Sequence, residues 1–391
     1  MANAPTSFSG RSPAGVGAPS IVGPSTDAPQ QGMIPFRRAT TERIDQLQVI
    51  TGTLGTTIQK NEQTIDGSGL LAGVDLDVQV TSSGNAAAVA FAEDAPYNIL
   101  NSVVLHDVSG EVINLPGYSL YLANKYGGWT PGKPAETSAD TNIYQLVSGT
   151  AANGGSFRFH LWAPTVWNRR TLMGLLGNQD RAQRYALRTD IDTLSTLYTT
   201  APTAAPSFTL TKHYWNFAVP AAQNQFGIAQ QQLPSTFGVL PFITQTTSES
   251  APQGGSTVNH YIKRLGNTVR LIILVFRSNG SRATAEANLP TKIQLKLGDV
   301  TIFTETPAMR RRIMWDRYNF DAPAGVLVYD WTTDLDNRAG AELGDDWQWT
   351  QAIVQAQFAI TYPSGFGSTN NSLTFVTLDM LVPAGVDPYA G

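Results

Sequence analysis

The sequence predicts an all-β protein of sandwich or jelly-roll type, and two observations carry this prediction. Apolar side chains recur at every second position along several short stretches, which places alternate side chains on opposite faces of a half-buried strand. These stretches are separated by clusters of Gly, Ser and Asn, while helical patterns are few. Many short strands with irregular polar connections are typical of a sandwich or jelly roll, and nothing indicates the regular strand-helix alternation of a parallel α/β fold.

The alternation is clearest in residues 74–80, where aliphatic side chains are interleaved with two aspartates and a glutamine. The same spacing predicts further strands at residues 157–161, 208–217, 239–247, 293–297, 353–360 and 373–381. Turn-forming clusters lie between them at residues 82–85, 152–155, 278–281 and 364–371.

Helices are expected at four places. Phe36 to Ile50 has Ile44 and Leu47 three apart, which predicts a short amphipathic helix with Thr40 or Thr41 as its N-cap. Segments of two or three turns are predicted at residues 118–126, 169–179 and 307–318.

The chain has 391 residues, so two domains are expected, with one large all-β domain as the alternative. The strand pattern is interrupted at Ala221 to Phe237, which is rich in glutamine, and the halves on either side each insert one helical segment after a pair of strands. We therefore divide the chain into a flexible arm with a short helix, a first sandwich, a linker and a second sandwich, at residues 1–49, 50–225, 226–237 and 238–391.

Composition excludes several classes of function. Only 14% of residues are charged and the net charge is −4, so there is no basic field for wrapping nucleic acid. Without cysteine there are no disulfides, thiolate zinc sites or cysteine nucleophiles. The apolar run from Leu271 to Phe276 has the length of a strand, no apolar run approaches the roughly 20 residues of a membrane-spanning helix, and no secretion signal begins the chain, so we expect a protein that is soluble when made.

Short segments spread over residues 50–382 carry a family resemblance by their order and spacing. They are Gly69-Leu70-Leu71, Tyr97-Asn98-Ile99-Leu100 before Val103-Val104-Leu105, Phe159 to Pro164, Arg184 to Arg188, Leu233-Pro234 with Val239-Leu240-Pro241, and, most clearly, Arg310-Arg311-Arg312-Ile313 followed by Gly325 to Asp330. In this order they resemble the major capsid proteins of tectivirus-type phages.

The resemblance implies a fold of two tandem eight-stranded jelly rolls with short inserted helices. It implies a homotrimer that forms a pseudo-hexagonal capsomer of an icosahedral shell, around an internal membrane and a double-stranded DNA genome. The implied partners are further copies of the chain, penton and minor capsid proteins and the internal viral membrane. The implied location is the capsid shell of the virion, after assembly in the host cytoplasm, and no catalytic residue, cofactor, metal or direct contact with nucleic acid is expected.

Two arginine clusters are the candidate functional residues. Arg310, Arg311, Arg312 and Arg317 form the densest positive cluster and could pair with carboxylates of a neighbouring subunit; the alternative is a solvated helix face with Met314 and Trp315 in the core.

The second cluster, Arg37, Arg38 and Arg43, could lie against acidic lipid headgroups inside the shell, or contact neighbouring subunits. The sequence departs from the family before Phe36, where prolines and glycines replace the helical segment on the inner side of the shell. A membrane role carried over from the family is therefore in doubt for those residues.

Other candidate sites have simpler explanations. The acidic segment of Asp334, Asp336, Glu342, Asp345 and Asp346 could bind a divalent cation, but its spacing does not match an EF-hand and an exposed loop is the simpler interpretation. The two glycosylation sequons that begin at Asn279 and Asn370 are interpreted as turns. The four histidines, which are far apart and expected to be structural, are His106, His160, His213 and His260.

Two alternative functions stay open. A carbohydrate- or receptor-binding β-sandwich, such as a vertex or spike protein, would expose a cluster of aromatic side chains on one face. A glycan-active enzyme would need two carboxylates that face a cleft. No catalytic motif supports the enzyme.

Overall fold

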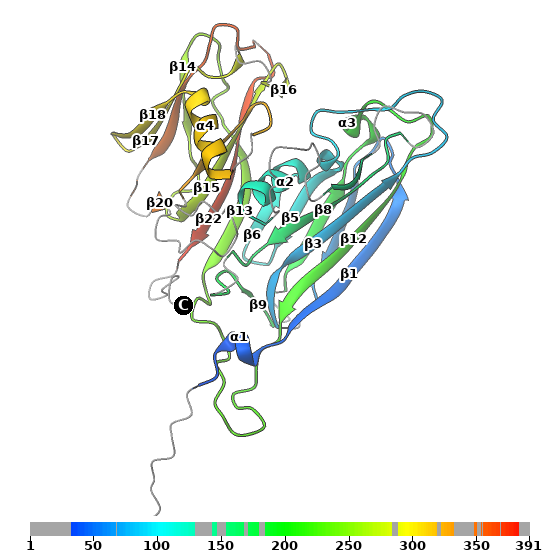
Figure 1. The fold of residues 1–391 in the computed structure, drawn as a ribbon, viewed down its shortest axis with the longest axis vertical. Helices are drawn as coiled ribbons and strands as arrows, with labels where there is room; N and C mark the ends of the chain where they lie inside the picture. The colour runs from blue at the N-terminus through cyan, green and yellow to red at the C-terminus, as the bar shows by residue number, and fades with distance from the viewer. Residues whose placement is uncertain are drawn as a thin grey trace, which may run out of the picture.

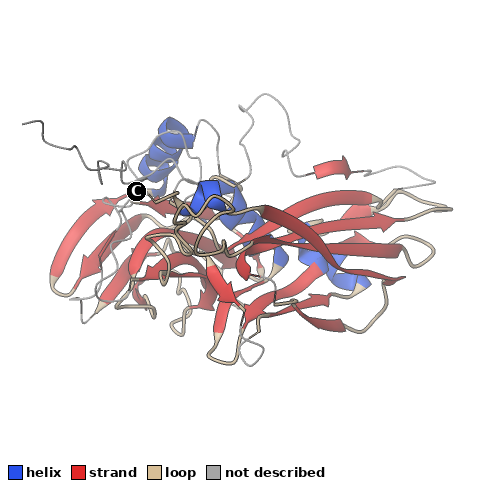
Figure 2. Cartoon of the chain, turned by 90° about the horizontal axis from the view of Figure 1, so that it is seen from below, coloured by secondary structure: helices blue, strands red, loops and turns tan. Residues whose placement is uncertain are grey.

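The structure, a computed structural model, describes most of the chain between Met33 and Val382. The described residues are 33–67, 69–129, 143–146, 154–167, 171–179, 184–283, 288–318, 322–331, 348–349, 353, 355–367 and 369–382. Strands make up nearly all of the regular structure and the helices are short, as Figure 2 shows.

The first half of the chain forms two facing antiparallel sheets. One sheet has the strand order β1-β12-β3-β8-β7, with β9 beside β3, and the other has the order β2-β10-β5-β6. The bounds are β1 Glu42–Thr53, β2 Gln59–Thr64, β3 Gly69–Thr81, β5 Leu100–His106, β6 Glu111–Leu115, β7 Ile143–Leu146, β8 Phe157–Pro164, β9 Leu176–Asn178, β10 Ala186–Ile191 and β12 Ser207–Phe217.

The second half repeats this plan. Strands β13, β22 and β15 form one sheet, with β19, β16 and β20 beside β15, and the facing sheet has the order β14-β21-β17-β18. The bounds are β13 Leu240–Thr247, β14 Thr257–Tyr261, β15 Thr268–Ser278, β16 Ser281–Arg282, β17 Lys292–Leu297, β18 Val300–Glu305, β19 Val326–Asp330, β20 Gln348–Trp349, β21 Ala356–Thr361 and β22 Ser372–Leu381.

Taken in chain order, β1, β2, β3, β5, β6, β8, β10 and β12 occupy the same sheet positions as β13, β14, β15, β17, β18, β19, β21 and β22. Each set is an eight-stranded jelly roll. In both, one helix follows the fifth of these strands: α2 (Gly117–Tyr126) comes after β6, and α4 (Pro307–Tyr318) after β18. The prediction of two tandem eight-stranded jelly rolls with short inserted helices is confirmed.

The remaining elements are small. They are α1 (Phe36–Ala39), the 3₁₀ turn η1 (Tyr97–Ile99), α3 (Leu194–Leu197) and the two-stranded pair of β4 (Ala90–Phe91) with β11 (Tyr198–Thr200). Strands β12 and β13 are separated by residues 218–239, which contain no named strand and fold into a loop beside α1 at one end of the molecule (Figure 1).

The two jelly rolls share one sheet. Strand β6 of the first pairs in parallel with β13 of the second, with Ile113 opposite Ile243 and Asn114 opposite Thr244. This pairing fuses one sheet from each jelly roll into a ten-stranded sheet. Backbone hydrogen bonds therefore cross the junction, which a flexible linker would not provide.

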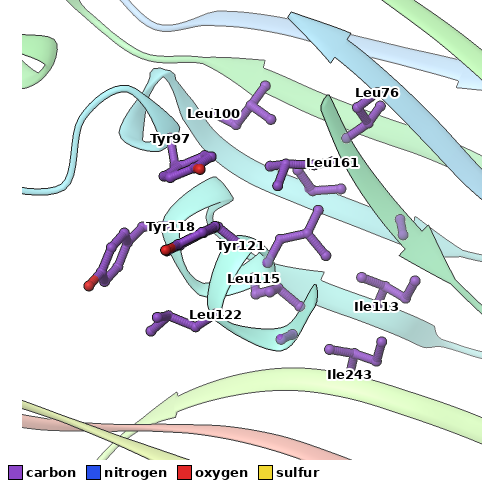
Figure 3. Packing of buried hydrophobic residues seen from close by; sticks show 14 of the residues in the cluster. Leu76, Tyr97, Leu100, Ile113, Leu115, Tyr118, Tyr121, Leu122, Leu161 and Ile243 are labelled. Atoms are coloured by element: carbon purple, nitrogen blue, oxygen red, sulfur yellow. The ribbon is translucent and has the colours of Figure 1, made fainter. Parts of the chain in front are cut away.

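Helix α2 fills the angle between the jelly rolls. Its residues are buried all round except Lys125, as expected for a helix that packs against protein on every side. Figure 3 shows Tyr121 and Leu122 between Tyr97 on one side and the Ile113 and Ile243 pair on the other. The rings of Tyr97 and Tyr121 stack with their centroids 4.0 Å apart.

The position of strand β15 in the fold explains the apolar run from Leu271 to Phe276. Leu271, Ile273 and Val275 belong to the large core that contains α2, whereas Ile272 and Leu274 belong to the core of the second jelly roll. A strand that is buried on both faces needs apolar side chains at successive positions. The run from Leu271 to Phe276 is therefore apolar because it belongs to a sheet that is covered on both faces.

Polar contacts also join the two units. Arg270 on β15 donates to the carbonyl oxygen of Gly127 at the end of α2, at 3.1 Å, where a positive charge complements the helix dipole. Arg282 on β16 lies 3.0 Å from Asp94 of the first jelly roll, and its guanidinium lies over the ring of Tyr118. Arg277 on β15 pairs with the same Asp94.

The predicted helix from Phe36 to Ile50 is wrong beyond its first turn. Helix α1 ends at Ala39 with Thr40 as its C-cap, and Glu42–Thr53 is strand β1. A bulge between Gln46 and Gln48 shifts the alternation of β1 by one residue. Ile44 is 54% exposed whereas Leu47 packs on the core, so the pair that suggested a helix lies on opposite faces of the strand. Beyond the bulge, Leu47 and Ile50 both pack on the core at a spacing of three, which also resembles a turn of helix.

The predicted helix at residues 169–179 is also wrong. The described part forms turns and strand β9. Leu172 and Gly174 both have positive φ, 56° and 95°, which a right-handed helix does not allow. The predicted helices at residues 118–126 and 307–318 are confirmed as α2 and α4.

Both sequon segments form turns, as predicted. Asn279 and Gly280 have φ of 54° and 82° and connect β15 to β16, with Ser278 paired to Ser281. Two successive residues with positive φ match the left-handed turn preferred in a two-residue hairpin, and Asn-Gly is its commonest sequence. Asn370 has φ of 48° and precedes β22.

Truncation of Leu122 to Ala should test the role of α2. The side chain is fully buried in the shared core, so we expect a loss of about 2 to 5 kcal/mol in the free energy of unfolding, measured with urea. Val108→Ala is the control, because Val108 is 73% exposed and its truncation should cost less than about 0.5 kcal/mol. Equal effects of both substitutions would contradict a packed junction.

His260 should make the protein sensitive to acid. It is fully buried, 2.8 Å from Ser248 Oγ and 2.9 Å from Tyr362 Oη, and burial lowers the pKa of its imidazole to about 4. The unfolded chain takes up this proton near the ordinary pKa of 6.5, so the stabilisation present above pH 6.5 is lost progressively as the pH falls to about 4.

Thermal unfolding between pH 7 and pH 4 measures this effect. In the His260→Gln variant the dependence of the melting temperature on pH should be shallower than in the unchanged protein. His213→Gln, on the outer face of β12, should keep the original slope. A slope that is the same in all three proteins would exclude His260 as the cause.

Candidate subunit and membrane interfaces

The arginine cluster lies on α4, which begins where Pro307 stops the preceding strand. Proline is favoured in the first turn of a helix, and Thr306 Oγ1 accepts a hydrogen bond from the N–H of Met309 at 3.3 Å. The helix therefore starts at a defined residue, and its turns separate the consecutive arginines onto different faces.

Arg310 faces its own subunit. It is buried and forms a bidentate pair with Glu305 at the end of β18, with N···O distances of 2.7 and 2.8 Å. Its guanidinium also lies 4.3 Å from the ring centroid of Tyr329, whose pKa is raised well above its ordinary value, chiefly by burial. With both carboxylate oxygens of Glu305 engaged, Arg310 has an internal role.

The rest of the cluster faces outward. Arg312 is exposed, and Arg311 is half-buried with its Nε unpaired among the described residues. Met314 is buried, as predicted, but Trp315 is 45% exposed and so lies outside the core. The side chain of Arg317 lies outside the described residues. The structure thus leaves Arg311, Arg312 and Trp315 on the surface of α4.

The second arginine cluster lies at one end of the molecule (Figure 1). Phe36 of α1 is buried in a small core with Leu70 and Phe217, which fixes α1 against the first sheet. Arg37 and Arg38 on the same short helix are exposed, and Arg43 is exposed on β1. The structure therefore brings Arg37 and Arg38 together on one helix and places Arg43 on the neighbouring strand.

The loop of residues 218–239 adds apolar side chains to this end. Ile34 donates to Ala229 at 2.9 Å and accepts from Gln231 at 2.9 Å, so the loop and the segment before α1 run side by side. Phe226 is 76% exposed and Met33 is 61% exposed. We call the surface formed by Met33, Arg37, Arg38 and Phe226 the basal surface. No pattern in the sequence indicated that this loop and the segment before α1 would lie side by side.

Three of the four histidines make polar contacts within the fold. His106 lies 3.5 Å from Glu62, His160 pairs with Asp75, and His260 is the buried residue described above. Within the described ranges no three His, Asp or Glu side chains are placed to hold a metal ion. The acidic segment from Asp334 to Asp346 lies outside those ranges. None of the helices that the structure describes has the length and apolar character to cross a bilayer.

No protein-family model matches the sequence, and no curated protein matches it. Solved structures do match. One is the STIV MCP, from Sulfolobus turreted icosahedral virus, at 13% identity and a TM-score of 0.60, over 88% of this chain and 97% of that one. The chain has the double jelly-roll fold.

Two further structures share this fold. A quasi-atomic model of the PBCV-1 virus capsid matches at 12% identity and a TM-score of 0.60, over 87% of this chain and 93% of that one. The major capsid protein P2 of bacteriophage PM2 matches at 9% identity and a TM-score of 0.50, over 89% and 100%. At these identities the comparisons establish the fold over nearly the whole length of each protein.

Arg310→Ala should destabilise the single subunit, whereas Arg312→Ala should not. Removing Arg310 leaves Glu305 buried without its counter-ion, which typically costs about 3 to 5 kcal/mol, while an exposed arginine contributes less than about 1 kcal/mol. Urea unfolding of the two variants measures the difference. If Arg310→Ala is as stable as the unchanged protein, the ion pair of Arg310 with Glu305 does not stabilise the subunit.

Proposed function

We propose that this protein is a major capsid protein, which acts as a homotrimeric, pseudo-hexagonal capsomer of an icosahedral shell. The observation that carries the proposal is the tandem of two jelly rolls with the same strand order and the same helix insertion, fused through one sheet. Proteins with this fold and nearly the same length include the STIV MCP and the major capsid protein of phage PM2.

The proposal assigns no enzymatic activity, cofactor or direct contact with nucleic acid to the chain. Its location is the capsid shell of the virion, after assembly in the host cytoplasm, and the shell encloses an internal membrane and a double-stranded DNA genome. Its partners are further copies of itself, neighbouring capsomers, and penton and minor capsid proteins. The sparse charge and net charge of −4 suit a surface that packs against protein more than one that binds nucleic acid.

The proposed domain division keeps the boundaries near the loop. A first jelly roll up to residue 225, a linker at 226–237 and a second jelly roll from 238 agree with the absence of any named strand between Phe217 and Leu240. The proposed arm is shortened, because β1 begins at Glu42 and pairs with β12 along its whole length. We therefore place the arm before Glu42 and not at residues 1–49.

Open strand edges supply surfaces for association. Strand β1 borders the first sheet and carries the exposed side chains of Ile44 and Val49. Strand β18 borders the last sheet and carries those of Val300 and Ile302. Long edges with apolar side chains favour pairing with another chain, and a closed ring of three copies covers them without growing a filament.

The exposed arginines of α4 are proposed to bind a neighbouring subunit. Arg311 and Arg312 can pair with carboxylates, and the exposed Trp315 and Met309 on the same helix supply apolar contact area. Arg317 is included with them from the sequence, and Arg310 is left out because it is engaged with Glu305.

The double substitution Arg311→Glu and Arg312→Glu tests the capsomer. Light scattering on the unchanged protein should give a particle of three times 42.1 kDa, and charge reversal should shift the population towards single chains at the same concentration. Lys292→Glu is the matched control, since Lys292 is exposed on β17. A single chain in the unchanged protein would reject the proposed function, and trimers in the double variant would reject only this interface.

The basal surface is proposed to face the internal membrane. Residues 33–41 and 218–241 contain no Asp or Glu, so no carboxylate from either segment offsets Arg37 and Arg38. Phe226 on the neighbouring loop could insert into the interface between headgroups and acyl chains. Arg43 lies further along β1 and would contribute through long-range attraction. The partner that this surface fits is an anionic bilayer.

Vesicle flotation tests the basal surface. Trimers should float with phosphatidylglycerol vesicles at low salt and far less with phosphatidylcholine vesicles. Arg37→Ser with Arg38→Ser should weaken binding about tenfold or more, because each arginine contributes about 1 kcal/mol near an anionic surface. Phe226→Ser should weaken it further.

The control for flotation is Lys292→Ser, which lies on the second jelly roll. Point substitutions are preferable to deleting residues 1–43, because such a deletion removes Phe36 from its core and the start of β1. Equal flotation of all variants, with trimers intact, would show that the basal surface does not bind lipid.

A further inference from the structure

A pocket on the outer face of the first sheet shares only Arg37 with the surfaces assigned to the proposed shell. It has a volume of about 300 Å³ and lies on the side of the sheet that faces away from the core. Its floor comes from the outward positions of neighbouring strands: Trp162 on β8, Asp75 on β3 and Trp215 on β12. Trp129, which follows α2, lines the pocket as well.

The tryptophans are held in a fixed arrangement. The rings of Trp162 and Trp215 lie 5.2 Å apart at an angle of 71°. Trp162 lies over Gly73, where a Cβ atom would come within 2.6 Å of the indole ring. Glycine at this position of β3 therefore allows the indole to lie close to the sheet and to form a wall of the pocket.

The pocket is lined by both hydrogen-bond acceptors and a hydrogen-bond donor. Glu42 at the start of β1 and Asp75 provide carboxylate oxygens, Asp75 being paired with His160, and Arg37 provides a guanidinium.

This combination excludes several classes of ligand. A lipid chain would make no hydrogen bond with Glu42 or Arg37, so the polar side of the pocket would contribute nothing to its binding. A simple anion would meet Glu42 and Asp75, and a simple cation would meet Arg37. The ligand that fits must both donate and accept hydrogen bonds and must present an apolar face to the indole rings.

We propose that this pocket binds a small saccharide, with a pyranose ring against Trp162 and Trp215, hydroxyl groups donating to Asp75 and Glu42, and ring or hydroxyl oxygens accepting from Arg37. This activity goes beyond building a shell and does not depend on it. A cluster of aromatic side chains on one face is the feature expected of the carbohydrate-binding β-sandwich that we considered as an alternative function.

Saturation-transfer NMR on the full chain tests the proposal. The probes are glucose, galactose, N-acetylglucosamine and N-acetylneuraminic acid in the millimolar range, each as the free sugar and as its methyl glycoside. We expect transfer to at least one of them. Preference for the glycoside would indicate a unit within a glycan chain, and preference for the free sugar would indicate a small metabolite.

Matched variants locate the site. Trp162→Leu and Asp75→Asn should each weaken binding about tenfold, which corresponds to about 1.4 kcal/mol. Tyr261→Leu removes an exposed aromatic side chain elsewhere, and Asp77→Asn removes the next outward carboxylate of β3, which pairs with Arg158 and does not line the pocket. Both controls should bind as the unchanged protein does, and thermal unfolding should show that all four variants are folded.

Three results would overturn the proposal. One is no transfer to any probe in the unchanged protein. Another is binding that Trp162→Leu and Asp75→Asn leave unaltered, because the sugar would then occupy a different site. The third is a folded Trp162→Leu variant that no longer forms trimers, because the pocket would then be filled by a second copy of the chain.

Discussion

The structure depends on one sheet that is buried on both of its faces. Strands β13, β22 and β15 close the core of the second jelly roll with one face and cover α2 with the other. Because β6 extends this sheet through its parallel pairing with β13, the two jelly rolls cannot rotate against each other without breaking backbone hydrogen bonds and exposing the shared core. The shared sheet therefore resists rotation of one jelly roll against the other.

Rigidity of this kind has a consequence for assembly. A subunit whose two jelly rolls are fixed relative to each other presents its edges and loops at constant angles, so identical contacts can be repeated around a ring. The ion pairs of Arg277 and Arg282 with Asp94 also hold the second jelly roll against the first. The free edges of β1 and β18 remain as the places where neighbours can add strands or side chains.

The same arrangement separates three kinds of surface. The shared sheet and α2 are internal, the basal surface gathers exposed arginines and an exposed phenylalanine at one end, and the tryptophan pocket lies on the outer face of the first sheet. Arg310 and Arg312 show how closely these roles can lie in sequence. Two residues along one helix change an arginine from an internal counter-ion into an exposed charge.

The sequence by itself determined the class of fold and the positions of many of the strands. Alternation in β3, β8, β12 and β17 reports directly which side chains face a core, because the pleat reverses at each residue. It failed at β1, where the bulge at Gln46 to Gln48 gave a helical spacing, and at Leu172 and Gly174, where positive φ is invisible to periodicity. It also identified both arginine clusters by their density alone.

Only the tertiary structure decided what those residues contact. The parallel pairing of β6 with β13 joins Ile113 to Ile243 across 130 residues, and no local pattern encodes a pairing of that range. Lys212 occupies an inward position of β12 and is tolerated there because Asn61 of β2 accepts its hydrogen bond. Trp162 of β8 and Trp215 of β12 meet because the outer face of the first sheet brings them together, and Trp129, which follows α2, lines the same pocket. Long-range contacts are set by the whole packing of the chain, whereas periodicity records only which face of each strand is buried.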